Sequence, residues 1–231
     1  MQVDLHNFFR YYDDKNPKHK AAVDQLELDL TKKSPDLIDD TSNWIKIYRT
    51  KPELPKSAVL SVPYYPQTDN YRDASRTCNS SSCAMCLEFF KPTTLQGTKG
   101  DDAYIQKVFA VGDTTDHAVQ TKVLASYGVK SEFRYNLSFA DLDAELAAGR
   151  PVVIGILHRG TLSAPTGGHM IVAIGKNTNG DYVINDPYGN LMDGYTTDVY
   201  NGKGVVYPKA ILNRRWLPDG PNTGWGRIFT S

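Results

Sequence analysis

Residues 78–90 read CNSSSCAMCLEFF, and this stretch decides the fold of the chain. A polar loop, Tyr71–Thr77, precedes it, an apolar run fills its second half, and Pro92 follows shortly after it. Because a residue before proline avoids the helical conformation, the pattern predicts a helix that begins at about Cys78 and ends near Phe90. One cysteine therefore stands at the N-terminus of an apolar helix.

The position of Cys78 favours a reactive thiol. A cysteine nucleophile attacks as its thiolate, whereas a free thiol with a pKa of about 8.5 is mostly protonated at neutral pH. The unpaired N–H groups of a helix N-terminus and a neighbouring protonated histidine both lower that pKa. Cys83 and Cys86 lie deeper in the helix, where we expect small core residues. Their C-x-x-C spacing has no second pair, so a metal or redox role is the weaker interpretation.

His169 is the best candidate among the five histidines for the base that activates Cys78. It follows residues 164–168, which we expect to be flexible, and it opens an apolar strand over residues 169–174. Glycines immediately before a histidine let the backbone approach a site closely. His158 ends another apolar strand, residues 152–157, and is the one serious rival.

Asp186 is the candidate that orients the histidine. The strands 169–174 and Tyr182–Asn185 flank the turn 177–180 and predict a hairpin. Symmetric pairing about this turn sets residue 171 opposite 186 and residue 169 opposite 188, so His169 and Asp186 become diagonal neighbours on one face. A slip of one residue would separate them. A buried aspartate in this place would fix the imidazole tautomer and stabilise the imidazolium.

Two donors are candidates for stabilising the negative charge of the transition state. One is the backbone N–H of Cys78 at the helix start, and the other is the side-chain amide of Gln67, eleven residues upstream. The sequence holds no H-E-x-x-H motif and no paired ligand spacing, so we expect neither a metal nor another cofactor.

Helices in the first part of the chain and antiparallel strands in the second predict an α+β fold. We divide the chain into a helical N-terminal segment (1–50), a proline-punctuated linker (51–57) and a catalytic domain (58–231). A strand is expected to start at Val59 and to be interrupted by Pro63. Helices are expected over residues 101–110 and 115–127, and a third from Ser138 to Gly149 with Asp141 completing a capping box.

The bulk composition excludes several classes of protein. Lys+Arg and Asp+Glu both number 26 among 231 residues, so the chain lacks the basic excess of a nucleic-acid-binding protein or of a polybasic membrane anchor. No run approaches the roughly 18 apolar residues of a membrane-spanning helix, and residues 1–10 do not resemble a signal peptide. We therefore expect no nucleic-acid partner, no stable membrane insertion and synthesis in the cytoplasm. We also expect a monomer, although the sequence leaves the oligomeric state open.

The motifs around these residues resemble those of the bacteriocin-processing peptidase-like family of papain-fold cysteine peptidases. The resemblance covers about residues 58–230, and its motifs are Pro63-Tyr64-Tyr65-Pro66-Gln67, residues 78–85, Gly167-Gly168-His169-Met170 and Asn185-Asp186-Pro187-Tyr188-Gly189. It implies a papain-like fold in which a catalytic helix packs on an antiparallel sheet. It also implies a nucleophile at Cys78, a base at His169, an orienting residue at Asp186 and an oxyanion-hole amide at Gln67. Asn79 departs from the family pattern, which often has glycine there.

The segment from Asp186 to Gly226 is further similar to phage and bacterial members of the family that degrade cell walls. This resemblance implies an endolysin-like endopeptidase that cleaves peptide stems or crosslinks of peptidoglycan and reaches the wall after release from the host cytoplasm. The alternatives are a peptidase for proteins or leader peptides and a non-catalytic phage virion component. Four residues are the candidates for substrate binding: Asn79, Gly168, Tyr188 and Trp225. Trp216 and Trp225 could stack on substrate, although a packing role is the more common one for such tryptophans.

Overall fold

A computed structural model describes residues 16–19, 21, 59–195 and 199–230 of the chain. The chain divides into two units, Met1–Lys56 and Ser57–Ser231, and each is described by itself. In the first unit the side-chain oxygen of Asn16 accepts a hydrogen bond from the N–H of Lys18 at 3.0 Å, and residues 17–19 and 21 are helical. The predicted N-terminal segment and linker otherwise lie outside the described residues.

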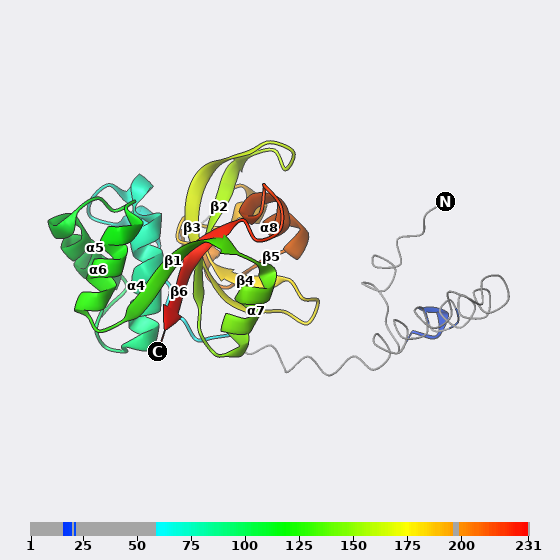
Figure 1. The fold of residues 1–231 in the computed structure, drawn as a ribbon, viewed down its shortest axis with the longest axis horizontal. Helices are drawn as coiled ribbons and strands as arrows, with labels where there is room; N and C mark the ends of the chain where they lie inside the picture. The colour runs from blue at the N-terminus through cyan, green and yellow to red at the C-terminus, as the bar shows by residue number, and fades with distance from the viewer. Residues whose placement is uncertain (1–15, 20, 22–58, 196–198, 231) are drawn as a thin grey trace. The chain divides into compact units, whose positions relative to one another are not determined.

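Three helices come first in the second unit: α4 (Cys78–Phe90), α5 (Gly100–Val111) and α6 (His117–Ser126). Short 3-10 helices, η2 (Gln67–Asp69) and η3 (Ala74–Arg76), precede α4. Helix α6 begins where it does because the carboxylate of Asp116 accepts the N–H groups of Ala118 and Val119. Figure 1 shows the three helices together on one side of the sheet.

The rest of the unit is a six-stranded sheet in the order β1-β6-β2-β3-β4-β5, and each pair of neighbours is antiparallel. The strands are β1 (Lys130–Leu137), β2 (Val152–Gly160), β3 (Pro165–Lys176), β4 (Tyr182–Asn185), β5 (Val205–Tyr207) and β6 (Gly224–Thr230). Between them lie α7 (Phe139–Ala147), η4 (Leu191–Asp193), η5 (Val199–Gly202) and α8 (Lys209–Trp216).

Each face of the sheet covers its own hydrophobic core. Met170, Val172 and Ile174 of β3 pack toward α4, together with the buried half of that helix. Alternate residues of the same strand, Ile171 and Ala173, pack on the other face in a core that includes residues of α7 and α8. This alternation follows from the period of two in a strand, and it fixes which residues of β3 can reach the N-terminus of α4.

The structure confirms the predicted helix over Cys78–Phe90, including its end before Pro92. The capping box also forms, because the Ser138 side chain accepts from the N–H of Asp141 and the Asp141 carboxylate accepts from the N–H of Ser138. The hairpin of β3 and β4 pairs Val172 with Asn185, which is the predicted register. An irregularity after Ala173 accommodates one extra residue on the side of the turn.

Two expectations about secondary structure were wrong. The chain after Val59 forms no strand, because Pro63 and Pro66 cannot donate to a ladder; its backbone hydrogen bond to β3 runs from Leu60 N–H to Ile174 O at 2.8 Å. Residues 165–168, expected to be flexible, belong to β3 and pair with β2. In addition, the elements β1, β5, β6 and α8 were not predicted.

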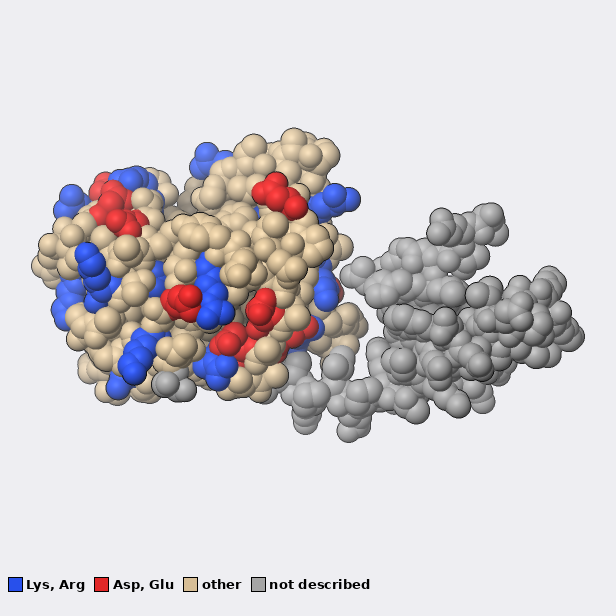
Figure 2. Space-filling model, viewed as in Figure 1, with Lys and Arg blue, Asp and Glu red and all other residues tan. Residues whose placement is uncertain are grey.

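The visible face of the second unit carries both Lys/Arg and Asp/Glu side chains, separated by uncharged ones (Figure 2). Among the described residues no helix is long and apolar enough to cross a membrane.

Candidate active site

Cys78 is the first residue of α4, and its side chain is half-buried and free of any disulfide. The first N–H groups of a helix have no intrahelical acceptor, so they favour a negative charge at this end. The backbone N–H of Met170, across the contact between α4 and β3, and that of Asn79 also approach the thiol. Backbone geometry alone therefore provides an environment for a thiolate.

His169 lies on β3 and its side chain is 4% exposed. The Nε2 atom of its ring is 2.7 Å from Oδ1 of Asp186, which immediately follows β4. Because the carboxylate can only accept, Nε2 carries the hydrogen and Nδ1 is the nitrogen left to face the thiol of Cys78. The thiol of Cys78 and the imidazole of His169 lie close enough to shift each other's pKa, because His169 lowers that of the thiol and Cys78 raises that of the imidazole. The structure thus brings the three residues into one chain of contacts.

The carboxylate of Asp186 is fully buried and accepts four hydrogen bonds. Oδ1 accepts from His169 and from the backbone N–H of Tyr188 at 2.9 Å. Oδ2 accepts from the hydroxyl groups of Tyr207 at 2.7 Å and Tyr195 at 3.3 Å. A buried charge is tolerated only when it is paired and hydrogen bonded, and this environment meets both conditions.

The backbone of Asp186 is held equally firmly. Its N–H donates to the carbonyl oxygen of Gly202 at 2.8 Å, and its own carbonyl accepts from the hydroxyl of Tyr64 at 2.9 Å. A Cβ at position 202 would collide with that carbonyl oxygen, so only glycine fits there. The backbone of Asp186 is therefore fixed by two separate segments of the chain, in addition to the donors that hold its carboxylate.

These contacts favour a thiolate–imidazolium pair. Burial lowers the pKa of His169, but the charge and hydrogen bond of Asp186, together with Cys78, outweigh it and raise this pKa to about 10. Burial likewise raises the pKa of the Cys78 thiol, but the hydrogen bond and charge of His169 lower it below the ordinary value. Both shifts favour transfer of the proton from the sulfur to the imidazole, which would leave a thiolate able to act as a nucleophile.

His158, the rival base, lies beside His169 with the two ring centroids 4.9 Å apart. Its Nδ1 donates to the carbonyl oxygen of Gly167 at 2.6 Å, and its Nε2 accepts from Nε of Arg159 at 3.3 Å. Burial, followed by the charge of His169, lowers the pKa of His158 to about 4. Both of its nitrogens are thus engaged and the ring is neutral, which leaves His169 as the imidazole that faces Cys78.

Gln67 opens η2 and is buried. Its side-chain Nε2 donates one hydrogen to the carbonyl oxygen of Ala74 at 2.7 Å, which leaves the second hydrogen of the amide for another acceptor. Its backbone N–H donates to the carbonyl oxygen of Pro187 at 2.8 Å, directly after Asp186. Its Oε1 has no donor among the described protein groups. The amide thus belongs to the segment that joins the aspartate loop to the N-terminus of α4.

Asn70 fastens this segment to the catalytic helix. Its side-chain Nδ2 donates to the hydroxyl of Thr77 at 2.8 Å and to that of Ser81 at 2.9 Å, in the first turn of α4. The Ser81 hydroxyl in turn donates to Asp101 on α5 at 2.6 Å. Burial raises the pKa of Asp101 to about 7. The residues of this network are buried, and no motif in the sequence indicated it.

The four candidates for substrate binding lie in different surroundings. Gly168 is exposed and a Cβ there would meet open space, and the Tyr188 ring lies 6.1 Å from that of His169. Asn79 is buried and its amide contacts Nδ1 of His117 at 3.2 Å, so its side chain points into the protein. The half-buried indole of Trp225 fills the space over Gly155. Gly168 and Tyr188 therefore border the site, whereas the side chain of Asn79 supports it.

Cys83 and Cys86 are fully buried and free, as expected for core residues. Burial raises the pKa of each thiol, which makes both unreactive at neutral pH. Among the described residues no group of three or more His, Cys, Asp or Glu side chains could hold a metal ion.

The tyrosines that surround Asp186 were not predicted. Tyr195 and Tyr207 lie 9 and 21 residues beyond it, in segments without a periodic pattern. The one available signal was the frequency of tyrosine, 14 residues against 8 phenylalanines, which does not say which rings meet. Tyr64 stood within a recognised motif, but its bond to the backbone of Asp186 depends on the fold.

The chain matches one family model and resembles solved structures of peptidases in fold. The family model described as "Peptidase_C39 like family" matches residues 59–220. A Bacillus anthracis structure described as a C39-like peptidase superposes with a TM-score of 0.52 at 16% identity, covering 76% of this chain and 98% of that one. A double glycine motif protease from an AMS/PCAT transporter, in complex with a leader peptide, gives a TM-score of 0.47 at 19% identity, with coverages of 74% and 91%. None of the curated proteins matches the chain.

Proposed function

The chain belongs to the Peptidase_C39 like family and is a cysteine peptidase with a papain-like fold, and on this premise we propose that it is an endopeptidase that cleaves the peptide part of bacterial peptidoglycan. In this proposal Cys78 is the nucleophile, His169 the general base and acid, and Asp186 the residue that orients the imidazole. The observation that carries the assignment is the continuous contact from the thiol through His169 to Asp186, with Nε2 and Oδ1 2.7 Å apart.

The first half of the reaction forms a thioester. The Cys78 thiolate attacks the carbonyl carbon of the scissile bond, and the carbonyl oxygen takes the negative charge of the tetrahedral intermediate. The Cys78 N–H and the free hydrogen of the Gln67 amide are the proposed donors to that oxygen. His169 then gives its Nδ1 proton to the leaving nitrogen, and the C–N bond breaks. The amine product departs and the acyl group remains on the sulfur.

The second half of the reaction returns the enzyme to its starting state. Neutral His169 accepts a proton from water, whose oxygen attacks the thioester carbon through a second tetrahedral intermediate. Collapse of this intermediate releases the carboxylic acid and the Cys78 thiolate, while His169 keeps the proton. The negative charge of Asp186 stabilises the imidazolium in both halves, and its hydrogen bond keeps Nδ1 directed at the reacting atoms.

The resemblance of residues 186–226 to cell-wall-degrading members supports peptidoglycan as the substrate. Part of this segment lies close to the catalytic pair, because the side chain of Arg215 donates to the carbonyl oxygens of Leu157, Arg159 and Gly160 at 2.6 to 3.2 Å. These bonds fix the end of β2 next to His158 and His169. As an endolysin-like enzyme, the protein would act as a monomer on the wall after release from the host cytoplasm.

Digestion of purified peptidoglycan tests the proposal. Wild-type protein, Cys78→Ala and the matched control Cys83→Ala would be incubated with walls from several bacterial types, and the fragments identified by mass spectrometry. We expect new peptide termini with wild type and with Cys83→Ala, and none with Cys78→Ala. The mass of the fragments would identify the bond.

Two other results would contradict the proposal. In the first, the walls stay intact but a protein or leader peptide is cleaved, again only when Cys78 is present. This result would show that the substrate is a polypeptide rather than peptidoglycan. A Cys78 thiol that fails to react with iodoacetamide near neutral pH would contradict the catalytic assignment itself and favour a non-catalytic component of a virion.

A further inference from the structure

Three aromatic rings form a continuous ledge on the helical side of the sheet, which we call the aromatic ledge: His117, Phe133 and Tyr135. The rings of His117 and Phe133 are stacked, with centroids 3.5 Å apart and planes at 12°. The ring of Tyr135 meets that of Phe133 edge to face at 5.1 Å. His117 begins α6 and the other two residues lie on β1, so the ledge bridges the helices and the sheet.

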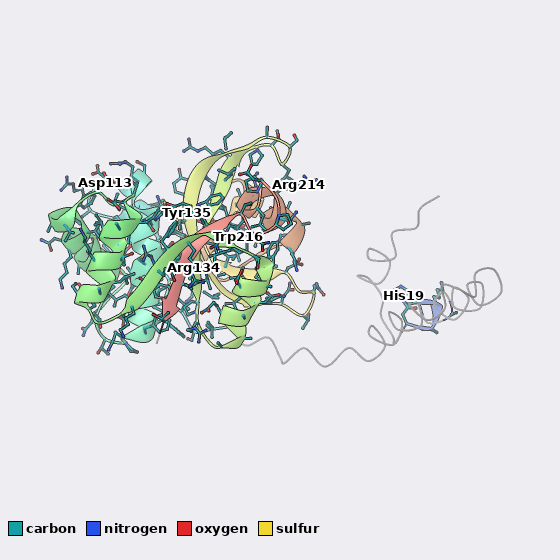
Figure 3. The ribbon with its side chains drawn as sticks, in the orientation of Figure 1. His19, Asp113, Arg134, Tyr135, Arg214 and Trp216 are labelled. Carbon is teal, nitrogen blue, oxygen red and sulfur yellow. The ribbon has the colours of Figure 1, made fainter. Side chains whose placement is uncertain are left out.

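The ledge is connected to the nucleophile through one residue. Asn79 follows Cys78 in α4, and its side-chain amide contacts Nδ1 of His117 at 3.2 Å. Cys78 and Phe133 also pack against the same hydrophobic core. Figure 3 shows Tyr135 between the helices and the β2–β3 hairpin. Across the sheet, Phe133 pairs with Arg227 of β6, Arg227 pairs with Val153 of β2, and Val153 pairs with Val172 of β3, the strand that carries His169.

Tyr135 is 69% exposed, more than any other large apolar side chain of the described residues. Its strand is an edge of the sheet, and the pairing of β1 with β6 is irregular between Arg134 and Leu137, which leaves Tyr135 outside the regular ladder. An exposed aromatic ring on the same sheet as a catalytic histidine is a typical contact for a ligand, because it offers apolar area at low cost in side-chain entropy.

The charges on and around the aromatic ledge indicate which kind of ligand it could bind. Burial and the nearby guanidinium of Arg227 lower the pKa of His117 to about 4, so this ring is neutral at pH 7. Next to the ledge, Arg134 forms an ion pair with Glu132 at 2.6 Å, so the two charges balance. A ligand for this surface is therefore uncharged where it lies on the rings, with an apolar face for stacking and polar groups at its edge.

A pyranose sugar has this chemistry, since its C–H groups form an apolar face and its hydroxyl and amide groups lie around the rim. We propose that the aromatic ledge is a glycan subsite, in which the exposed ring of Tyr135 stacks on the sugar that carries the stem peptide. This inference rests on the proposed peptidoglycan substrate.

Binding to the inactive Cys78→Ala chain tests the subsite without cleavage. The probe is the N-acetylglucosamine–N-acetylmuramic acid disaccharide, titrated by nuclear magnetic resonance into Cys78→Ala alone and combined with Tyr135→Ala or Tyr135→Phe. Aromatic stacking energies predict that Tyr135→Ala weakens binding by roughly two- to tenfold, whereas Tyr135→Phe keeps the stacking and binds as the parent does. Val206→Ala on β5, which truncates an exposed side chain at the opposite edge of the sheet, is the matched control and should bind like the parent. The subsite would be overturned if the disaccharide did not bind at all. It would also be overturned if Cys78→Ala bound the disaccharide equally well alone and combined with Tyr135→Ala, Tyr135→Phe or Val206→Ala.

Cleavage kinetics separate this inference from the proposed function. The preference of the enzyme is the ratio of kcat/KM for a disaccharide-linked stem peptide to that for the same peptide without sugar. We expect Tyr135→Ala to lower this ratio by the same roughly two- to tenfold, mainly through KM. Cleavage of both substrates with a ratio unaffected by Tyr135 would refute the subsite and leave the endopeptidase intact. Disaccharide binding that depends on Tyr135, without cleavage of either substrate, would refute the proposed substrate bond and leave the subsite intact.

Discussion

Asp186 and Asp101 are both fully buried aspartates next to the catalytic residues, yet their surroundings differ. Asp186 accepts four hydrogen bonds, including one from His169, and its charge raises the pKa of that imidazole. Asp101 accepts one bond from Ser81 through Oδ2, while its Oδ1 has no donor among the described protein groups. Burial consequently raises the pKa of Asp101 to about 7, with the charges of Asp102 and Asp69 contributing.

The segments around Asp186 and Asp101 also differ in how many of their buried polar atoms are hydrogen bonded. Of the six buried side-chain atoms without a partner in the described part of the chain, four are oxygens near the oxyanion side, in Gln67, Asp69, Asn70 and Asp101. None of the six belongs to His169, to Asp186 or to the tyrosines that donate to its carboxylate. Unsatisfied buried acceptors are costly, whereas a satisfied network is rigid. Hydrogen bonds therefore hold His169 and Asp186 firmly. Most of the unsatisfied buried atoms lie instead around the segment that carries Gln67, the proposed oxyanion-hole amide.

The largest expected effect comes from Asp186→Asn. An amide cannot stabilise the imidazolium and favours the wrong imidazole tautomer, so kcat should fall on the order of a hundred- to ten-thousandfold. The pKa of His169 should fall and that of the Cys78 thiol should rise, which would shift the pH dependence of iodoacetamide alkylation to higher pH. Asp143→Asn, at a partly exposed carboxylate that pairs with Lys176, is the matched control and should keep full activity. Equal activity in the two variants would remove Asp186 from the mechanism.

A smaller effect is expected from Tyr207→Phe, which deletes one donor to Oδ2 of Asp186. The matched variant is Tyr182→Phe, because Tyr182 is equally buried and donates at the same 2.7 Å, but to the partly exposed Asp143. Loss of a buried hydrogen bond to a charged group should lower the free energy of unfolding by about 1–3 kcal/mol in Tyr207→Phe and by less in Tyr182→Phe. Only Tyr207→Phe should also lower kcat, by roughly three- to tenfold. Denaturant unfolding and steady-state kinetics would measure both quantities, and an equal loss of kcat in the two variants would contradict a specific role of Tyr207.

The smallest effect on activity is expected from Asp101→Asn. Its expected effect is on the free energy of unfolding, which should depend less on pH in this variant than in the wild type. In the unfolded chain the aspartate has a pKa of about 3.9, whereas in the folded protein it is about 7. Between these values the folded state binds more protons than the unfolded state, so wild-type stability should fall as the pH rises from about 4 to about 7. Asp101→Asn should lack this decrease, which is about 1–4 kcal/mol in size.

Denaturant unfolding at several pH values would measure this decrease. Asp113→Asn is its control, because hydrogen bonds from Thr115, assisted by Arg76, lower the pKa of Asp113 to about 2, below the range in question. This control should keep the decrease between pH 4 and 7. A decrease that persists unchanged in Asp101→Asn would assign it to another group.

Part of the site could be predicted because its signals are local. The helix at Cys78 follows from a polar loop, an apolar run and Pro92, all within 22 residues of sequence from Tyr71. The register that brings His169 and Asp186 onto one face follows from the length of a single hairpin turn. By contrast, the edge strand β1 was missed because its exposed and half-buried residues show no regular alternation. The strand β6 was missed because its pairing partners, β1 and β2, are remote in sequence.

The sequence by itself determined the order of Gln67, Cys78, His169 and Asp186, the helix that activates the thiol, and the hairpin that aligns histidine with aspartate. The tertiary structure alone decided that Tyr195 and Tyr207 satisfy the buried carboxylate and that His158 is neutral and engaged elsewhere. It also decided that the exposed ring of Tyr135 meets Phe133, which is stacked on His117 at the start of α6. The physical reason is the range of the interactions. Helix capping, proline stops and hairpin register act between near neighbours, whereas burial and hydrogen-bond satisfaction depend on which distant segments pack together.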